Sequence, residues 1–266
     1  MRLFRPLTIA VLLTVAMLGA ASGVSAAVHD DKTSSSGNDI GWPQCDAAYP
    51  AHAAFGIVGV NRGIVFSPNP CLASEIAWAG GLNAQLYANT GNPGPAISTH
   101  WPDGQLFPAA CNPDRTTNSW DRDTADCAYD YGYDAAADSY NDATQAFGEL
   151  ELKPATPAGS TWWFDVEISN SWRSAVDLNV AALQGAVAYL ASVGVPTANI
   201  GFYSTQYQWN LITGGTLAFS AFKSWVAGAP SAREVARTCL GPGFTGGAVA
   251  LAQYPSHGFD ADLRCN

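Results

Sequence analysis

Thr161-Trp162-Trp163-Phe164-Asp165-Val166-Glu167 is the stretch on which the fold prediction depends. Its bulky apolar and aromatic residues predict a buried β-strand. Because strand side chains alternate between two faces, Asp165 and Glu167 are expected to point the same way from the carboxyl end of that strand. Two neighbouring carboxylates repel each other, which raises the proton affinity of one and suits a general acid beside an ionised partner. The alternative is a solvated strand end at a loop.

The first 26 residues have the order of a secretory signal peptide. Arg2 and Arg5 precede an almost wholly apolar run, and Val24-Ser25-Ala26 is a small-residue cleavage site. This order predicts cleavage after residue 26 and a secreted, extracellular protein. The apolar run is too short to favour a retained membrane helix. Residues 27–37, which follow, are small and polar, and we interpret them as a disordered leader.

Charge excludes several classes of partner. The chain carries 12 basic and 22 acidic residues, a formal net charge of −10. Removing the predicted signal peptide takes away two arginines and no acid, so the charge becomes −12. A chain this acidic shows no basic patch for nucleic acid and no attraction for an anionic membrane. We therefore expect neither partner, and we expect a monomer.

Six cysteines, all after the predicted signal peptide, favour disulfide bonds in a secreted chain. None forms a CxxC pair, and no histidine completes the spacing of a zinc site. Six cysteines allow fifteen pairings, which sequence alone cannot distinguish. We favour sequential pairing because each loop is then local: Cys45–Cys71, Cys111–Cys127 and Cys239–Cys265.

Eight strand-like runs follow one another along the chain, separated by loops or helical patterns. Strands that alternate with helices predict a parallel sheet, and eight of them predict a (β/α)₈ barrel. Since only some connections look helical, we expect an irregular TIM-like α/β barrel in a single domain over 38–266. An open doubly wound sheet is the alternative, but no GxGxxG loop follows the first strand. The expected strands are 38–45, 55–61, 84–90, 161–167, 199–204, 224–228, 248–254 and 259–263.

Four helices are expected between those strands. The clearest spans 178–193, where apolar residues recur at spacings of four and three before a glycine ends the pattern. A second spans 124–148 and has Asp123 or Thr124 as its candidate cap. Residues 91–123 are rich in Pro, Asn and Asp, and we interpret them as a surface excursion fixed by a disulfide bond. The other two expected helices are 72–80 and 207–212.

In such a barrel the chemistry lies at the carboxyl ends of the strands. Asp39 ends the first strand, Asp165 and Glu167 end the fourth, and Asp260 and Asp262 lie in the eighth. The first and eighth strands become neighbours when the barrel closes, so these acids are expected to meet at one mouth. Aromatic and amide side chains around acids form the kind of site that binds sugars by stacking and hydrogen bonds. Those expected on this rim are Tyr87, Asn89, Tyr203, Trp225, Gln253 and Tyr254.

Other chemistries fit the sequence less well. Gly-x-Ser-x-Gly is absent, so a hydrolase of the nucleophile-elbow type is unsupported. No EF-hand spacing is present, and we expect neither a metal nor another cofactor. His257, in a loop near the eighth strand, either approaches the mouth or lies on the surface. Trp42, after the first strand, is either a wall of the sugar site or a packing residue.

Taken together, these residues resemble glycoside hydrolase family 25, the secreted muramidases called Chalaropsis-type lysozymes. The resemblance is one of motifs and their order, and it covers most of the chain after the signal peptide. It is carried by Asp39, Asp165-Val166-Glu167, Tyr203-Ser204, Trp225-Val226-Ala227, Gln253-Tyr254 and Asp262-Leu263.

The resemblance implies a glycoside-hydrolase-like barrel over 38–266 that cleaves the β-1,4 bond after N-acetylmuramic acid in peptidoglycan, a polysaccharide. Glu167 would be the general acid/base. Asp165 would orient the acetamido group of the substrate or stabilise positive charge near the anomeric carbon, and Asp39 and Asp262 would complete an acidic floor. Two carboxylates with different proton affinities beside an oxocarbenium-like transition state predict the same assignment from the residues.

The chain also differs from the pattern of that family. Its first strand reads Asp39-Ile40-Gly41 where Asp-Val-Ser is usual, and Ala252 stands where a Trp commonly precedes Gln-Tyr. Three disulfides and the 91–123 excursion are not typical either. We interpret the chain as similar to a secreted, actinobacterial subgroup of the family. The alternative function is a non-catalytic protein that binds cell-wall glycan on the same barrel.

Overall fold

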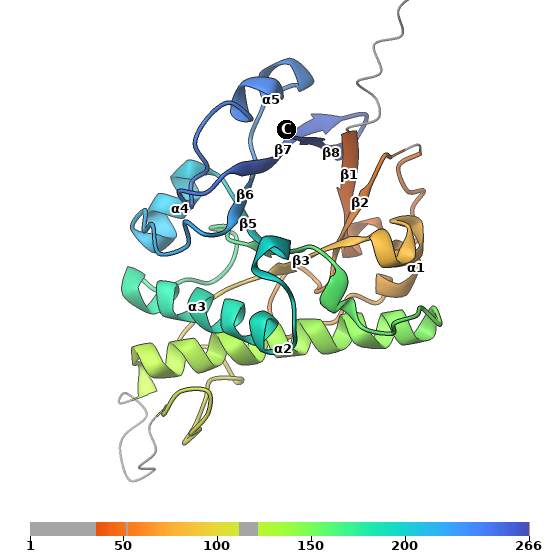
Figure 1. Ribbon diagram of the computed structural model, residues 1–266. Coiled ribbons are helices and arrows are strands. Elements are labelled where there is room, and N and C mark those ends of the chain that lie inside the picture. Colours follow the sequence, from red (N-terminus) through yellow and green to blue (C-terminus); the bar gives the residue numbers. More distant parts are fainter. Residues whose placement is uncertain (1–35, 52, 112–121, 266) are drawn as a thin grey trace, which may run out of the picture. The chain divides into compact units, whose positions relative to one another are not determined.

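The eight expected strands close into one barrel in the computed structural model, which describes residues 36–51, 53–111 and 122–265 (Figure 1). Strands that are neighbours in the chain are neighbours in the barrel, and the last pairs with the first. The protein is therefore a single α/β domain. Its strands are β1 (Ser36–Ile40), β2 (Gly56–Gly59), β3 (Gln85–Asn89), β4 (Trp162–Asp165), β5 (Ile200–Ser204), β6 (Lys223–Val226), β7 (Val249–Ser256) and β8 (Phe259–Arg264).

Two boundaries near the ends of strands differ from expectation. The predicted signal peptide and most of the predicted leader lie outside the described residues, but β1 begins at Ser36, inside the expected leader. Strand β4 ends at Asp165, so Glu167 lies in the loop that follows and not in the strand.

The direction of the last strand corrects the prediction of a parallel barrel. All pairs from β1–β2 to β6–β7 are parallel, but β8 is antiparallel to both β7 and β1. Only the turn His257-Gly258 joins β7 to β8, and both of its residues have positive φ, 53° and 83°. A two-residue turn of this kind reverses the chain, whereas a parallel return needs a crossover of about a dozen residues or more.

Helices connect the parallel strands from β2 onward. The four expected helices are confirmed, and a fifth, α5, was not predicted. Helix α2 begins where Thr124 accepts a hydrogen bond from the backbone of Cys127, so Thr124 and not Asp123 is its cap. The helices are α1 (Leu72–Trp78), α2 (Ala125–Glu149), α3 (Val176–Ser192), α4 (Gln206–Thr213) and α5 (Ala232–Thr238).

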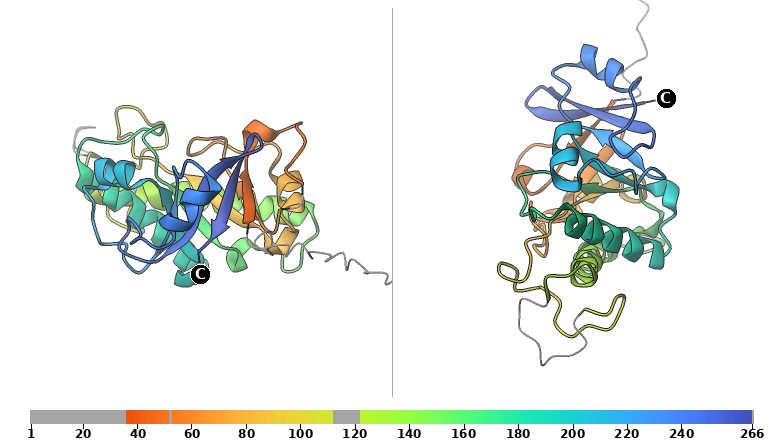
Figure 2. Two further views of the ribbon diagram at one scale, coloured as in Figure 1. Left: turned by 90° about the horizontal axis from the view of Figure 1, so that it is seen from above. Right: turned by 90° about the vertical axis from the view of Figure 1, so that its left-hand side faces the viewer.

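The two long helices, α2 and α3, lie side by side along the β3–β4 side of the barrel (Figures 1 and 2). Two glycines allow this close approach. A Cβ on Gly132 would lie 1.8 Å from the carbonyl oxygen of Ala182, and one on Gly185 would lie 1.9 Å from that of Tyr129. Each helix therefore packs its backbone against the other, which no larger residue at these two positions permits.

The hydrophobic core has an outer and an inner part. The outer part fills the space between the strands and the helices and includes Trp162, Phe164 and Phe202. The inner part lies inside the barrel and includes Ile57, Trp163, Trp225 and Leu251. The alternation of Trp162 and Trp163 between the two parts is the period-two pattern of a strand that is buried on both faces.

The three sequential disulfides are confirmed: Cys45–Cys71, Cys111–Cys127 and Cys239–Cys265. The second ties the excursion that follows β3 to the first turn of α2, as expected. Among the described helices, none combines the length and the apolar composition needed to cross a membrane.

Candidate active site

Asp165 is a buried carboxyl at the carboxyl end of β4, with 4% of its surface exposed. Asn89, at the end of the adjacent β3, donates its side-chain amide to Asp165 Oδ2. Within the described part of the chain, the other oxygen, Oδ1, is buried without a hydrogen-bond partner. Burial raises the pKa of Asp165 well above its usual value, and the nearby charges of Glu167 and Asp39 raise it further. Burial therefore favours the neutral form of the Asp165 carboxyl over its carboxylate.

Glu167 is half-buried in the loop after β4. Gln208 of α4 donates from Nε2 to Glu167 Oε1 at 3.3 Å and accepts from the backbone of Ile168 at 2.7 Å. Trp172 donates its indole N–H to the backbone carbonyl of Glu167 at 2.8 Å. The loop that carries Glu167 is therefore fixed from two sides, while its carboxyl keeps access to solvent.

Asp39, Gln253 and Tyr203 form a hydrogen-bonded row inside the barrel. Tyr203 OH donates to Gln253 Oε1 at 2.8 Å, and Gln253 Nε2 donates to Asp39 Oδ2 at 2.9 Å. Burial raises the pKa of Asp39 to about 6; hydrogen bonds from Gln253 and Asp262 oppose that rise, and the charge of Asp260 adds to it. Strands β1, β5 and β7, far apart in the sequence, thus contribute to one polar network.

Asp262 lies deeper than the sequence suggested. Because β8 is antiparallel, Asp260 pairs with Asp39 near the mouth, and Asp262 pairs with Gly37 farther inside. Asp262 is fully buried, accepts a 2.7 Å hydrogen bond from Trp225 Nε1 and shares a hydrogen bond with Asp39. Burial and the Asp39 carboxylate raise its pKa well above the usual value. Asp262 is therefore placed to act on a ligand through Asp39, whereas Asp260 is exposed at the mouth.

The expected aromatic residues occupy three different positions. Tyr87 and Tyr203 are half-buried, and their rings pack against that of Trp225 with centroids 6.1 and 4.4 Å apart. Trp225 itself is 1% exposed, so it forms the floor of the site and has no open face for a sugar. Trp42 follows β1 and is 38% exposed, and the guanidinium of Arg62 lies over its ring, 5.2 Å from the centroid. Trp42 is therefore a partly exposed aromatic ring at this rim.

Tyr254 is not brought to the site, which corrects its predicted place on the rim. Its neighbour Gln253 faces the interior, so strand alternation turns Tyr254 to the outside of β7. There its hydroxyl lies 3.0 Å from that of Ser36, and its ring packs beside Ala252 and Leu263. His257 lies at the exposed tip of the β7–β8 turn and contacts Ser256.

Residues that the sequence analysis did not single out hold this site in place. The side chain of Asn61 accepts from the backbone N–H of Asn89 at 2.9 Å and donates to its carbonyl at 3.1 Å, which fixes the residue that contacts Asp165. Gln208 and Trp172 hold Glu167 as described above. Asn61 ends the run 55–61, so its position was visible in the sequence, but the contact of Gln208 with Glu167 joins residues 41 positions apart and had no local signal.

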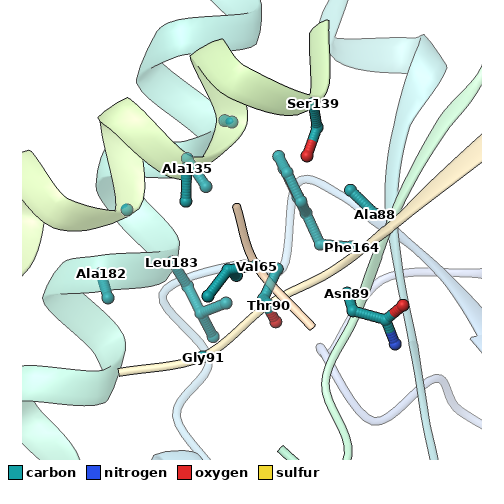
Figure 3. Close-up of a pocket in the computed structure, with 13 residues that line it drawn as sticks. Val65, Ala88, Asn89, Thr90, Gly91, Ala135, Ser139, Phe164, Ala182 and Leu183 are labelled. Carbon is teal, nitrogen blue, oxygen red and sulfur yellow. The ribbon is translucent and has the colours of Figure 1, made fainter. Parts of the chain in front are cut away.

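A small apolar cavity behind the β3–β4 wall is not part of this site. It has a volume of about 10 Å³ and lies between the strands and helices α2 and α3. Figure 3 shows Ala135, Ala182 and Leu183 facing it, with the amide of Asn89 turned away. A void of this size has room for about one water molecule at most. In the described ranges, no group of three or more His, Cys, Asp or Glu is arranged to hold a metal ion.

Comparison with known proteins finds lysozyme-like sequences and structures. A family model described as "Lysozyme-like protein 1" matches residues 117–233. The chain is 40% identical over 65 residues to the "Probable GH family 25 lysozyme 4" of Dictyostelium discoideum, and this match spans 24% of the chain and only 29% of that relative. The similarity in sequence is thus confined to part of each protein.

Among solved structures, the muramidase from Trichobolus zukalii superposes with a TM-score of 0.52 at 14% identity, covering 87% of this chain and 93% of that one. This likeness shows a shared fold. The muramidase from Acremonium alcalophilum gives a TM-score of 0.46 at 12% identity over 87% of this chain and 93% of that chain.

Proposed function

We propose that this protein is a secreted glycoside hydrolase that cleaves β-1,4 bonds in peptidoglycan or a related cell-wall glycan. The observation that carries the proposal is the pairing of a half-exposed Glu167 with a buried Asp165 at the mouth of the barrel. Two carboxyls in such different environments are the usual arrangement for acid–base cleavage of a glycoside. The lysozyme-like family match and the names of the relatives support the same class of substrate.

In this proposal Glu167 is the general acid/base. It is the carboxyl of the pair with access to the mouth, and Gln208 and Trp172 hold it and its loop in position. Glu167 protonates the oxygen of the scissile bond, and the carboxylate that results then removes a proton from the attacking water.

Asp165 assists as a neutral acid. Its Oδ2 accepts from Asn89, so a proton on the unpartnered Oδ1 is free to be donated. A hydrogen bond from Oδ1 to the carbonyl of an acetamido group would orient that group beside the anomeric carbon. The raised pKa of Asp165 favours this role over that of a charge stabiliser, because burial favours the neutral form of the carboxyl.

The remaining acids and aromatics bind and position the glycan. Asp39 and Asp260 lie nearest the mouth, with Asp262 behind Asp39. Tyr203 and Gln253 fix Asp39, and Trp42 offers an exposed ring for stacking. The three disulfides are consistent with the oxidising environment outside the cytoplasm.

The deciding experiment is digestion of purified peptidoglycan by wild type and by Glu167→Gln, with new reducing ends identified by mass spectrometry. We expect fragments ending in N-acetylmuramic acid from the wild type and a rate at least about 10²- to 10⁴-fold lower from the variant, the range for a lost acid–base catalyst. Glu149→Gln, a change at an exposed carboxylate of α2, is the matched control and should cleave like wild type.

Equal release by wild type and Glu167→Gln would remove Glu167 from the mechanism. If folded wild type released nothing while both proteins sedimented with insoluble cell wall, the protein would be a glycan-binding protein on this barrel and not an enzyme.

A further inference from the structure

A second cavity opens on the outer rim of the barrel, on the side of α2. Its volume is about 310 Å³, near the lower end for pockets that hold small ligands. We call it the rim pocket. Its walls come from the loops that follow β2, β3 and β4, from the excursion after β3 and from α2. The lining residues are Ile64, Val65, Phe66, Thr90, Gly91, Pro93, Ile97, Ser98, Thr99, His100, Tyr131, Asn170 and Ser171.

The rim pocket shares its wall with the candidate active site. Thr90 donates both its backbone N–H and its hydroxyl to the carbonyl oxygen of Asp165, at 3.1 and 2.6 Å. Asn170 donates its backbone N–H to the carbonyl of Glu167 at 3.1 Å. Since the carboxyl ends of adjacent parallel strands meet at one edge, the pocket and the site open on the same face of the barrel.

The chemistry of the lining is that of a carbohydrate subsite. The ring of Phe66 stacks on that of His100 with centroids 4.2 Å apart, and the edge of Tyr131 closes the same wall. Ile64 and Ile97 are 60% and 71% exposed and extend the apolar surface to solvent. Aromatic and apolar surfaces of this kind pack against the C–H face of a sugar ring.

Polar groups are available for the hydroxyls of the sugar. Ser98 and Thr99 contribute side-chain hydroxyls, and Asn170 contributes an amide. Over the described part of the chain, the Asn170 Nδ2 atom is buried and has no hydrogen-bond partner, and Asn170 is one of the residues that line the pocket. A buried unpaired donor costs stability that a bound hydroxyl or carbonyl oxygen would recover.

We propose that the rim pocket binds an uncharged sugar unit of the same glycan, farther along the chain than the sugars at Glu167. The inference rests on the proposed function. No Asp, Glu, Lys or Arg is among the thirteen lining residues, so a charged peptide attached to the glycan would have to leave its charges unpaired there. A neutral sugar meets no such penalty and uses both the rings and the polar groups.

Two other large cavities share no wall with the candidate active site. One of about 430 Å³ lies outside β1, β7 and β8 beside Tyr254, and one of about 640 Å³ lies at the opposite end of the strands beside Phe55 and Arg264. Neither is lined by Asn89, Asp165, Glu167 or any residue of the loops that follow β3 and β4. Of these three cavities, the rim pocket is the one lined by residues of the loops that follow β3 and β4.

The test is a binding series in the Glu167→Gln background, which separates binding from cleavage. Peptide-free glycan strands of increasing length are titrated into the protein by calorimetry. We expect a gain in affinity once the strand is long enough to reach the rim pocket. His100→Ala and Asn170→Ala should each reduce that gain by about three- to tenfold, the range for one lost aromatic or hydrogen-bonding contact.

Leu106→Ala is the matched control, because Leu106 lies in the same excursion, is 69% exposed and does not line the pocket. It should bind strands of every length like the Glu167→Gln parent. If His100→Ala and Asn170→Ala also bound long strands as tightly as this control, the pocket would hold no sugar. A gain seen only with peptide-bearing fragments would likewise overturn the proposal and assign the pocket to peptide.

The proposed function fails separately. Wild-type protein that binds glycan with the expected dependence on His100 but never cleaves it would disprove hydrolysis and leave the subsite standing. If wild-type protein cleaved glycan while all the variants bound glycan alike, hydrolysis would stand and the subsite would be disproved.

Discussion

The two opposite sides of the barrel are stabilised in different ways. The β3–β4 side is covered by α2 and α3, of 25 and 17 residues, and by the largest apolar core of the molecule (Figure 1). The β7–β8 side is covered by α5, of only seven residues, whose core cluster has just three buried apolar members in the described chain: Ala229, Val235 and Ala252.

This difference follows from how the strands are connected. A parallel strand requires a crossover, and a helix in that crossover brings its apolar face onto the sheet. The antiparallel β7–β8 hairpin needs only the turn His257-Gly258, so no helix lies between its strands. In place of apolar packing, this side has the Cys239–Cys265 disulfide and hydrogen bonds across the interior, such as that from Trp225 to Asp262. The helical side depends on shape complementarity, and the hairpin side on a covalent bond and buried polar contacts.

The largest effect should come from breaking the packing of the helical side. Gly132→Ala places a Cβ where only 1.8 Å separates it from the carbonyl oxygen of Ala182, so α2 and α3 must move apart. We expect the free energy of unfolding to fall by more than about 4 kcal/mol, because the obstacle is backbone and not a flexible side chain. Urea denaturation followed by circular dichroism measures this loss.

Gly148→Ala is the matched control within α2, since a Cβ there meets no atom within 4 Å. It should stabilise the protein by about 0.5–1 kcal/mol through helix propensity. Comparable behaviour of the two variants would contradict the close packing of α2 against α3.

The next largest loss of stability is expected when either of two disulfides that close loops of the same length is removed. Cys45–Cys71 and Cys239–Cys265 are each separated by 26 positions, so the chain-entropy model gives about 3.5 kcal/mol for either one. Replacing each pair with serine should therefore lower the free energy of unfolding by similar amounts. The loop between Cys239 and Cys265 contains both strands of the hairpin.

The two variants should differ in local protection. We expect amide hydrogen exchange in β7 and β8 to rise sharply without Cys239–Cys265, because little apolar core remains to hold that side. Loss of Cys45–Cys71 should leave the amides of β3 and β4 protected. Unchanged protection of the hairpin in the first variant would refute the contrast between the two sides.

A smaller effect is the dependence of the free energy of unfolding on pH, to which carboxyls on both sides of the barrel contribute. Several carboxyls have a folded-state pKa above that of the unfolded chain, chiefly because of burial, so the folded protein binds more protons than the unfolded one. The stability that these groups contribute is complete below the unfolded pKa near 4 and is lost as the pH rises through the folded pKa. The folded pKa is about 6 for Asp130 and Asp142 of α2 and about 7 for Glu75. We therefore expect stability to increase as the pH falls from 8 toward 5. The carboxyls with raised pKa include Asp39, Glu75, Asp130, Asp134, Asp138, Asp142, Asp165, Asp260 and Asp262.

Glu75→Gln isolates one of these groups on the helical side. Glu75 is fully buried, accepts a 2.7 Å hydrogen bond from Asn69 at Oε2 and has no partner for Oε1 in the described structure. The variant should have a shallower dependence of unfolding free energy on pH and should gain on the order of 2 kcal/mol relative to wild type between pH 5 and pH 8. Denaturation curves at several pH values measure both. An unchanged slope would show that Glu75 does not titrate in this range.

The sequence predicted the strands well because their signals are local. Most barrel strands contain a short apolar run between turn residues, and the disulfides followed from choosing local loops. The direction of β8 was missed because His257-Gly258 is not among the Asn-Gly or Asp-Gly pairs that most clearly signal a hairpin. Helix α5 was missed because Val235 is its one buried residue, so it presents no apolar face to recognise.

The candidate site was predicted less completely than the fold. Strand alternation brought Asp39, Asp165 and Gln253 together, and the same rule should have excluded Tyr254, which is adjacent to an inward residue. The depth of Asp262 depended on the direction of β8 and could not be known without it. The support of Glu167 by Gln208 depends on how α4 packs over the end of β4, which no short-range pattern encodes.

The antiparallel closure also decides how the domain can be attached to other structures. Ser36, which begins β1, pairs with Leu263 near the end of β8, so both ends of the barrel domain leave from the edge opposite the mouth. A tether or a fused domain at either end would leave the mouth of the barrel unobstructed. The same adjacency makes a circular permutant practical, with a short linker joining the two ends and new termini in an exposed loop.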